Sequence, residues 1–278
     1  MAALESIFRS YIQCIHEERW QDVLNFASFP LNYNGEDILT PEAFADKVKA
    51  VGRLQLDIDA ITVDAQTQRL GATLLAKLRL TVAATNKTVN VTEQQQSIIW
   101  VEDGKISKVA TISDHDGVQR QLSELGYVLT PDLIATYSPD TTGKNLSARE
   151  LGDTYRSYIG CINAQTMATE LSRFCHPHLI HNTRRLSLEE YRLLIQEAFT
   201  TVPDIIFGVD TVIADERAQR VAVRLELIGT PTGKLSGAEP TGRSVRFYEY
   251  VTYFFRDGKI DRLSIVDWKS YRQQLSQE

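Results

Sequence analysis

Apolar residues near the N-terminus recur at the spacing of an amphipathic helix. Positions 8, 11, 12 and 15 are apolar, which is the i, i+3, i+4, i+7 pattern of one helix face. The same pattern returns at positions 155, 158, 159 and 162. A shorter second helix is predicted after each of these. Its start is marked by Thr40-Pro41-Glu42 in the first case and by a capping box, Ser187 with Glu190, in the second.

Downstream of these helices the pattern changes to that of strands. Apolar-rich runs cover residues 54–64, 70–82, 88–101 and 105–114, and again 204–215, 221–230, 244–255 and 259–267. Asp-Gly pairs at 103–104 and 257–258 separate the last two runs of each set, as in tight hairpins. Helices followed by a long antiparallel meander are typical of an α+β fold.

The two halves of the chain also repeat each other in sequence. FRSYIQCI, from Phe8, recurs as YRSYIGCI, from Tyr155, with six of eight positions identical. DAQTQRL at 64–70 is echoed by DERAQRV at 215–221, and EDGKI at 102–106 by RDGKI at 256–260. The unchanged order indicates a duplicated domain. We predict a first domain at 1–127, a linker with two prolines and a glycine at 128–147, and a second domain at 148–278.

Charge and cysteine content exclude some classes of protein. Lys and Arg number 30 against 36 Asp and Glu, a net charge of −6, which argues against a nucleic-acid partner. No apolar run approaches the ~18 residues of a membrane span, and the N-terminus carries Glu5 and Arg9 where a signal peptide is apolar. Cys14, Cys161 and Cys175 are too few for a disulfide framework. We expect a soluble, cytoplasmic protein with reduced thiols.

The order of elements resembles the nuclear transport factor 2-like fold, and the second half is similar to the SnoaL-like polyketide cyclases. The residues that carry this resemblance are the run 229–233 (GTPTG) with Gly237 and 240–243 (PTGR), and the D-x-x-G-x-x-x-Q-L ending at 114–122. It implies two tandem cone-shaped α+β barrels, each with N-terminal helices packed on a curved antiparallel sheet, paired as an intramolecular pseudo-dimer. The first half has only a short turn in place of the PTGR hairpin, so we expect the second pocket to be the better preserved.

The resemblance also implies an acid/base aspartate at the end of the last strand, seven residues before Gln-Leu. That rule selects Asp114 and Asp267 as catalytic candidates, with Trp268 beside the substrate. Apolar neighbours would raise the pKa of such a carboxyl into a useful range. The alternative is that each Asp caps the helix that follows. Asp103 to Asp114 spans 11 residues and Asp257 to Asp267 spans 10, which predicts a strand residue gained or lost in one half.

Histidines supply further candidates. His178 (catalytic) and His181 (substrate-binding) lie in the run CHPHLIHN, near where the pocket mouth of this fold is expected, and an imidazole there could exchange a proton with substrate. A plain loop or core role is the alternative. His115 adjoins Asp114, so the two would face opposite sides if the strand continues. We expect no metal, because Cys175 and its neighbouring histidines lack a second pair of ligands.

The alternating strand from 247 to 253 has one face that must line the cone. If Tyr248 and Tyr250 point inward they form an aromatic substrate-binding wall, whereas if Glu249 does, a second catalytic carboxylate joins Asp267. The alternation of side chains along the strand allows either arrangement. The free-energy cost of burying an unpaired carboxylate favours the arrangement in which Glu249 points outward. The first half offers Gln94 and Gln96, or Gln95, in the matching strand.

No nucleotide, flavin, zinc-protease or hydrolase motif is present in the sequence, and we predict no cofactor. The resemblance implies a cofactor-independent cyclase or isomerase for a polyketide- or terpenoid-type small molecule, acting by acid/base catalysis in an apolar pocket. The alternatives are a dehydratase, hydratase or epoxide hydrolase on the same scaffold, or a non-catalytic pseudo-dimer that binds a ligand or a partner.

Overall fold

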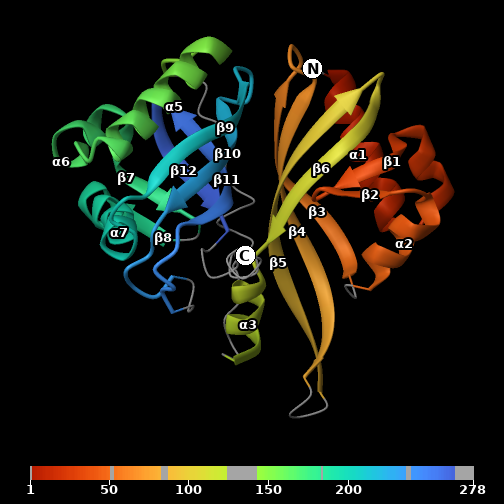
Figure 1. Ribbon diagram of the computed structural model, residues 1–278. Coiled ribbons are helices and arrows are strands. Elements are labelled where there is room, and N and C mark those ends of the chain that lie inside the picture. The colour runs from red at the N-terminus through yellow and green to blue at the C-terminus, as the bar shows by residue number, and fades with distance from the viewer. Residues whose placement is uncertain are drawn as a thin grey trace. The chain divides into compact units, whose positions relative to one another are not determined.

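The chain forms two compact units, residues 1–129 and 130–278. The computed structural model describes residues 2–50, 53–82, 87–123, 143–182, 184–235 and 239–266. Each unit is a six-stranded sheet with its N-terminal helices on one face (Figure 1), which confirms two tandem α+β folds. The limits of the linker stay a prediction, because residues 124–142 lie outside the described parts.

The first unit places its sheet in the order β2-β1-β6-β5-β4-β3. Its elements are α1 (Ala2–His16), η1 (Trp20–Asn25), β1 (Ala27–Tyr33), β2 (Glu36–Ile38), α2 (Pro41–Lys49), β3 (Arg53–Asp64), β4 (Arg69–Val82), β5 (Lys87–Glu102), β6 (Lys105–Ser113) and α3 (His115–Ser123). All four strands expected in this half are confirmed.

The second unit repeats the order as β8-β7-β12-β11-β10-β9. Its elements are α5 (Ala148–Asn163), α6 (Met167–Glu170), η2 (Leu171–Arg173), β7 (Cys175–His181), β8 (Arg184–Ser187), α7 (Leu188–Thr201), β9 (Ile206–Asp215), β10 (Arg220–Gly229), β11 (Val245–Arg256) and β12 (Lys259–Ile265). The two sheets thus share one topology, as the duplicated sequence predicted.

Each sheet is mixed, whereas a purely antiparallel sheet was expected. A short hairpin, β1–β2 or β7–β8, adds two strands, and β1 runs parallel to β6 as β7 does to β12. The run CHPHLIHN is therefore a strand rather than a loop. This places His178 and His181 on β7, between the edge strand β8 and β12.

The last two strands of each half pair in equivalent register over the described strands. Both last hairpins carry a register shift at the same place, between Trp100 and Val101 and between Phe254 and Phe255. Pairing elsewhere is equivalent, with Ser97 opposite Thr111 and Val251 opposite Ile265. No strand residue is gained or lost between Asp103 and Thr111 or between Asp257 and Ile265, so the two last strands face the same way over this stretch. The difference in spacing lies after it, where Asp267 is outside the described residues, and stays a prediction.

The helices form because their apolar faces pack on the sheets. In α1 the buried residues are Leu4, Phe8, Tyr11, Ile12, Cys14 and Ile15, and in α5 they include Tyr155, Tyr158, Ile159, Cys161 and Ile162. The predicted caps are also present, since the Thr40 hydroxyl accepts the Ala43 N–H and Ser187 and Glu190 form a capping box. No helix in the described part of the chain is long and apolar enough to cross a membrane.

Candidate functional site

Glu249 lies on the inner face of β11, toward the helices. Strand β11 pairs with β10 without irregularity from Val245 to Phe254, so Glu249 and Tyr253 point to the same side. The Tyr253 ring centroid is 5.1 Å from that of Tyr155 on α5. Glu249 is only 5% exposed. The preference for an outward Glu249 was wrong, because the carboxylate has interaction partners in this interior and is not buried alone.

Four buried tyrosines surround this face and are called the tyrosine cluster: Tyr155, Tyr158, Tyr191 and Tyr253. Tyr158 and Tyr191 share a hydrogen bond of 2.6 Å between their hydroxyls. Tyr155 Oη is buried with no hydrogen-bond partner in the described part of the chain. The cluster therefore combines a paired donor and an unused donor on the side of the sheet that holds Glu249.

Burial is the main cause of a raised pKa at all four tyrosines of the cluster. The nearby charge of Glu249 raises the pKa further at Tyr155 and Tyr253. The hydroxyls consequently keep their protons at neutral pH and can only donate to a developing negative charge or exchange hydrogen bonds. Hydroxyl donors beside a carboxylate suit proton transfer with stabilisation of an oxyanion.

Tyr248 and Tyr250 lie on the opposite face of β11 from Glu249. The Tyr248 hydroxyl donates to Glu226 Oε1 at 3.1 Å, and the guanidinium carbon of Arg224 is 3.7 Å from the Tyr248 ring centroid and 5.8 Å from that of Tyr250. The structure therefore separates these predicted substrate-binding tyrosines from the predicted carboxylate, although sequence alone allowed either set to face inward.

Of the histidine candidates, His181 lies at the tyrosine cluster and His178 does not. The His181 ring centroid is 6.2 Å from that of Tyr191, whereas the His178 side chain is exposed on β7. His176 is engaged elsewhere, with Nε2 at 2.8 Å from the carbonyl oxygen of Arg256. No group of three or more His, Cys, Asp or Glu side chains in the described ranges is arranged to hold a metal ion.

The two aspartate candidates have different outcomes. Asp114 Oδ1 accepts the N–H of Gly117 at 2.9 Å, so Asp114 caps α3, as the alternative interpretation allowed. Strand β6 ends at Ser113 and α3 begins at His115, so the strand does not continue through these residues. Asp267 and Trp268 lie outside the described residues.

The first unit holds a different polar group in the matching interior. Gln95, not Gln94 or Gln96, faces the core, because Gln95 stands opposite the core residue Leu74. Gln95 Nε2 donates to Glu93 Oε2 at 2.9 Å, and Glu93 Oε1 is 2.8 Å from His115 Nδ1. Sequence reasoning missed Glu93, although its odd-numbered position on the same strand as Gln95 could have indicated it.

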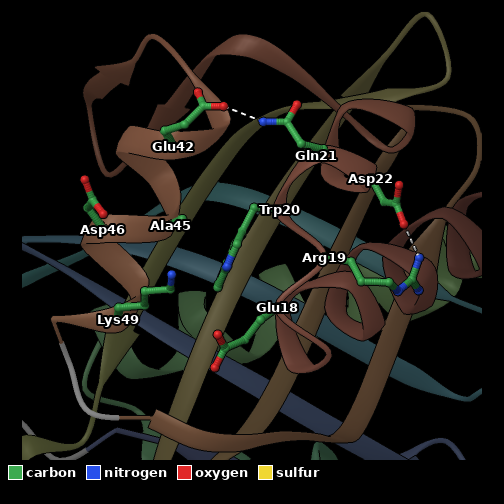
Figure 2. Close-up of a pocket in the computed structure, with 9 residues that line it drawn as sticks. All are labelled: Glu18, Arg19, Trp20, Gln21, Asp22, Glu42, Ala45, Asp46 and Lys49. Atoms are coloured by element: carbon green, nitrogen blue, oxygen red, sulfur yellow. Dashed lines mark hydrogen bonds and ion pairs between the residues drawn. The ribbon is translucent and has the colours of Figure 1, made fainter.

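A surface hollow of about 530 Å³ lies between η1 and α2 of the first unit (Figure 2). The Nζ atom of Lys49 lies 5.4 Å from the ring centroid of Trp20, and Arg19 pairs with Asp22 at 2.5 Å. None of the nine residues that line it was predicted as a site residue. Its charged side chains are largely solvated, which is typical of a surface depression.

Comparison with known proteins identifies the family. The model of the SnoaL-like polyketide cyclase family matches residues 152–275, and no curated protein matches the chain. Similar solved structures include a SnoaL-like polyketide cyclase of Agrobacterium tumefaciens (32% identity, TM-score 0.42, 45% of this chain and 98% of that one). Another is TsrD of Streptomyces laurentii (18% identity, TM-score 0.41, 47% and 98%). Through its second unit, the chain belongs to the SnoaL-like polyketide cyclase family.

Proposed function

We propose that the second unit is a cofactor-independent acid/base enzyme that cyclises or isomerises a polyketide- or terpenoid-type small molecule. The observation that carries this proposal is the buried Glu249 carboxylate on the face of β11 that meets the tyrosine cluster. Burying a carboxylate and an unpaired tyrosine hydroxyl costs stability, and such costs are typical of sites that serve a reaction.

In this proposal Glu249 removes a proton from a carbon next to a carbonyl group of the substrate. The carbonyl oxygen gains negative charge, and the unused hydroxyl of Tyr155 donates a hydrogen bond to it. The carbanion carbon then attacks a second carbonyl of the same molecule, and the alkoxide formed there takes the proton back from Glu249. A ring forms with no net oxidation and no added reactant. Returning the proton to another carbon instead gives an isomer.

Asp267 is proposed as a second acid/base group, and Trp268 and His181 as substrate contacts, on the family resemblance and, for His181, on its contact with Tyr191. We also propose that the two units pair within the chain as a pseudo-dimer. We propose a cytoplasmic location, because the three cysteines are free thiols and reduced thiols persist in the cytosol.

The test is metabolite profiling of source cells that lack the gene and carry wild-type protein or one variant. Cells that carry Glu249→Gln are expected to accumulate the substrate. The purified variant should turn over that compound about 10²-fold more slowly, the contribution usual for a positioned acid or base. Glu197→Gln on the exposed surface of α7 is the matched control. Asp267→Asn measures the second carboxylate separately.

The result also distinguishes the alternatives. Incorporation of ¹⁸O from labelled water into the product would indicate a hydratase or an epoxide hydrolase rather than a cyclase. An unchanged profile for Glu249→Gln and Asp267→Asn, alone and combined, would overturn the enzyme proposal and leave a ligand-binding module.

A further inference from the structure

The first unit contains a carboxylate–imidazole pair that the proposed function does not use. Glu93 on β5 is 1% exposed, and its Oε1 atom is 2.8 Å from Nδ1 of His115, whose side chain is 55% exposed at the start of α3. Gln95 holds the other carboxylate oxygen at 2.9 Å. A buried carboxylate thus fixes one ring nitrogen of a histidine that solvent reaches, an arrangement that orients an imidazole for proton transfer.

Polar side chains continue from this pair into the first unit. Ser97 stands opposite Thr111 in the ladder between β5 and β6, and their hydroxyls are 2.8 Å apart. Gln95 and Ser97 share the inner face with Glu93, since successive odd positions of β5 point to the same side. The row runs from buried Ser97, Gln95 and Glu93 to exposed His115, and it offers hydrogen-bonding groups along its length.

The duplicated second unit shows that the fold does not require these polar residues. At the positions that match Ser97 and Thr111, the second unit has Val251 and Ile265, which also stand opposite each other. Phe247 occupies the position that matches Glu93, and it lies two residues before Glu249 on the same face of the strand. The same topology therefore folds with apolar side chains at the positions of Glu93, Ser97 and Thr111, while Glu249 takes the position of Gln95. The polar residues at those three positions need an explanation other than folding.

We propose that the first unit has an acid/base site of its own, in which His115 transfers the proton and Glu93 is the positioning residue. The ligand class is a small neutral molecule with a carbonyl or hydroxyl oxygen that Gln95, Ser97 or Thr111 can bind. His115 takes a proton from a carbon next to the carbonyl and returns it to another atom of the same molecule. The step is an isomerisation in which one C–H bond breaks and one C–H or O–H bond forms, without a redox partner.

The test uses the full chain in source cells that lack the gene, with His115→Gln, Glu93→Gln, Glu93→Asp or Glu249→Gln supplied. His115→Gln is expected to accumulate a compound that wild-type protein consumes, and to lower turnover of that purified compound by about 10²-fold. Cells with Glu93→Gln should accumulate the same compound, with a smaller loss of turnover than His115→Gln. Glu93→Asp should restore part of the activity. His16→Gln, an exposed histidine on α1, is the matched control.

The pH profile separates positioning from a structural role. The hydrogen bond that the His115 ring donates to Glu93 raises the pKa of His115 above its usual value of 6.5, and the charges of Glu93 and Asp114, the charged groups that act on it among the described side chains, add to this. As a base His115 must be neutral, so the rising limb of the wild-type rate lies above pH 6.5. Glu93→Gln should move that limb to lower pH, whereas a purely structural role would leave it in place.

The outcomes distinguish this inference from the proposed function of the second unit. A wild-type profile for His115→Gln beside a changed profile for Glu249→Gln would overturn the first-unit site and keep the second. The reverse result would keep the first-unit site and reject Glu249. Accumulation of one compound by both variants would place both sites on one substrate and support each of them. If neither variant differs from wild type, both ideas fail.

Discussion

The two tyrosines of α5 differ in how their hydroxyls are satisfied. Tyr158 and Tyr155 are both almost fully buried, yet only Tyr158 has a hydroxyl partner, Tyr191, at 2.6 Å. Tyr155 Oη has no hydrogen-bond partner within the described ranges. An unpaired buried hydroxyl costs stability, whereas removing one member of a buried pair leaves the other unsatisfied. Equal chemical changes at the two positions therefore have effects of different expected size.

We predict that Tyr158→Phe lowers the free energy of unfolding by about 1–3 kcal/mol, because the hydroxyl of Tyr191 loses its partner. Tyr155→Phe should lower the free energy of unfolding by less than this, since Tyr155 Oη forms no hydrogen bond of normal geometry with the described residues. If Tyr155 donates to the substrate, the same variant lowers turnover by about 10²-fold. Urea unfolding followed by circular dichroism, with an assay on the compound that Glu249→Gln cells accumulate, measures both. Equal destabilisation by the two variants would contradict the assignment.

The sequence could predict the chemistry of these residues but not which of them meet. Alternation along 247–253 put Glu249 on one face and Tyr248 and Tyr250 on the other, but it gave no sign of which face the helices cover. The contact of Glu93 with His115 was hidden for another reason. It depends on β6 ending at Ser113 so that α3 begins at His115, a boundary that apolar periodicity does not locate to one residue.

At the scale of elements, the long strands and their turns could be predicted because their signals are strong. The Asp-Gly turns are present, with φ of 50° at Asp103 and Asp257 and 74° at Gly104 and Gly258. The hairpins β1–β2 and β7–β8 were not predicted. Their strands are short, and β1 and β7 each contain a proline. These two strands are held by parallel pairing to β6 and β12, which are far away in sequence. Such non-local pairing leaves little local signal.

Two glycines of the second unit are placed in opposite surroundings. A Cβ at Gly160, on the exposed side of α5, would meet nothing within 4 Å. A Cβ at Gly229, where β10 ends, would lie 2.5 Å from Val202 Cγ1 and 3.0 Å from Ile205 Cα. The second contact is with backbone, so a change of side-chain rotamer cannot relieve it.

We predict that Gly160→Ala raises the free energy of unfolding by about 0.5–1 kcal/mol, because alanine is the better helix former. Gly229→Ala should lower it by about 1–3 kcal/mol through overpacking against residues 202–205, the segment that follows α7. Chemical unfolding of the two variants beside wild type measures the difference. A neutral Gly229→Ala would show that the end of β10 moves easily away from Ile205.

At the scale of the whole molecule, duplication has given one topology two different interiors. The first unit has Glu93, Gln95 and Ser97 along its inner β5 face, and the second has Phe247, Glu249 and Val251 in the same register. Each unit keeps one buried carboxylate, but the positions of the two carboxylates differ by two residues along the matching strands. The scaffold constrains where the strands lie and leaves the inner side chains free to diverge, so the two units need not share a substrate.

The proposed pseudo-dimer makes a thermodynamic prediction about the whole chain. If the units pair, unfolding one removes the partner surface of the other, so the two should unfold together. The chain has 3 tryptophans, and with Trp268→Phe the remaining two, Trp20 and Trp100, both report on the first unit. Adding Gly229→Ala, a change in the second unit, should then lower the Tm seen by tryptophan fluorescence by about 3 °C per kcal/mol.

Gly160→Ala in the same Trp268→Phe background is the matched control, and it should raise the fluorescence Tm, because stabilising the second unit stabilises a coupled whole. Far-UV circular dichroism reports on both units at once and should give the same midpoint as fluorescence. If Gly229→Ala instead lowers only part of the circular dichroism transition and leaves the fluorescence midpoint in place, the units unfold independently. The duplication would then have joined two separate folds, each with its own chemistry, rather than built one pseudo-dimer.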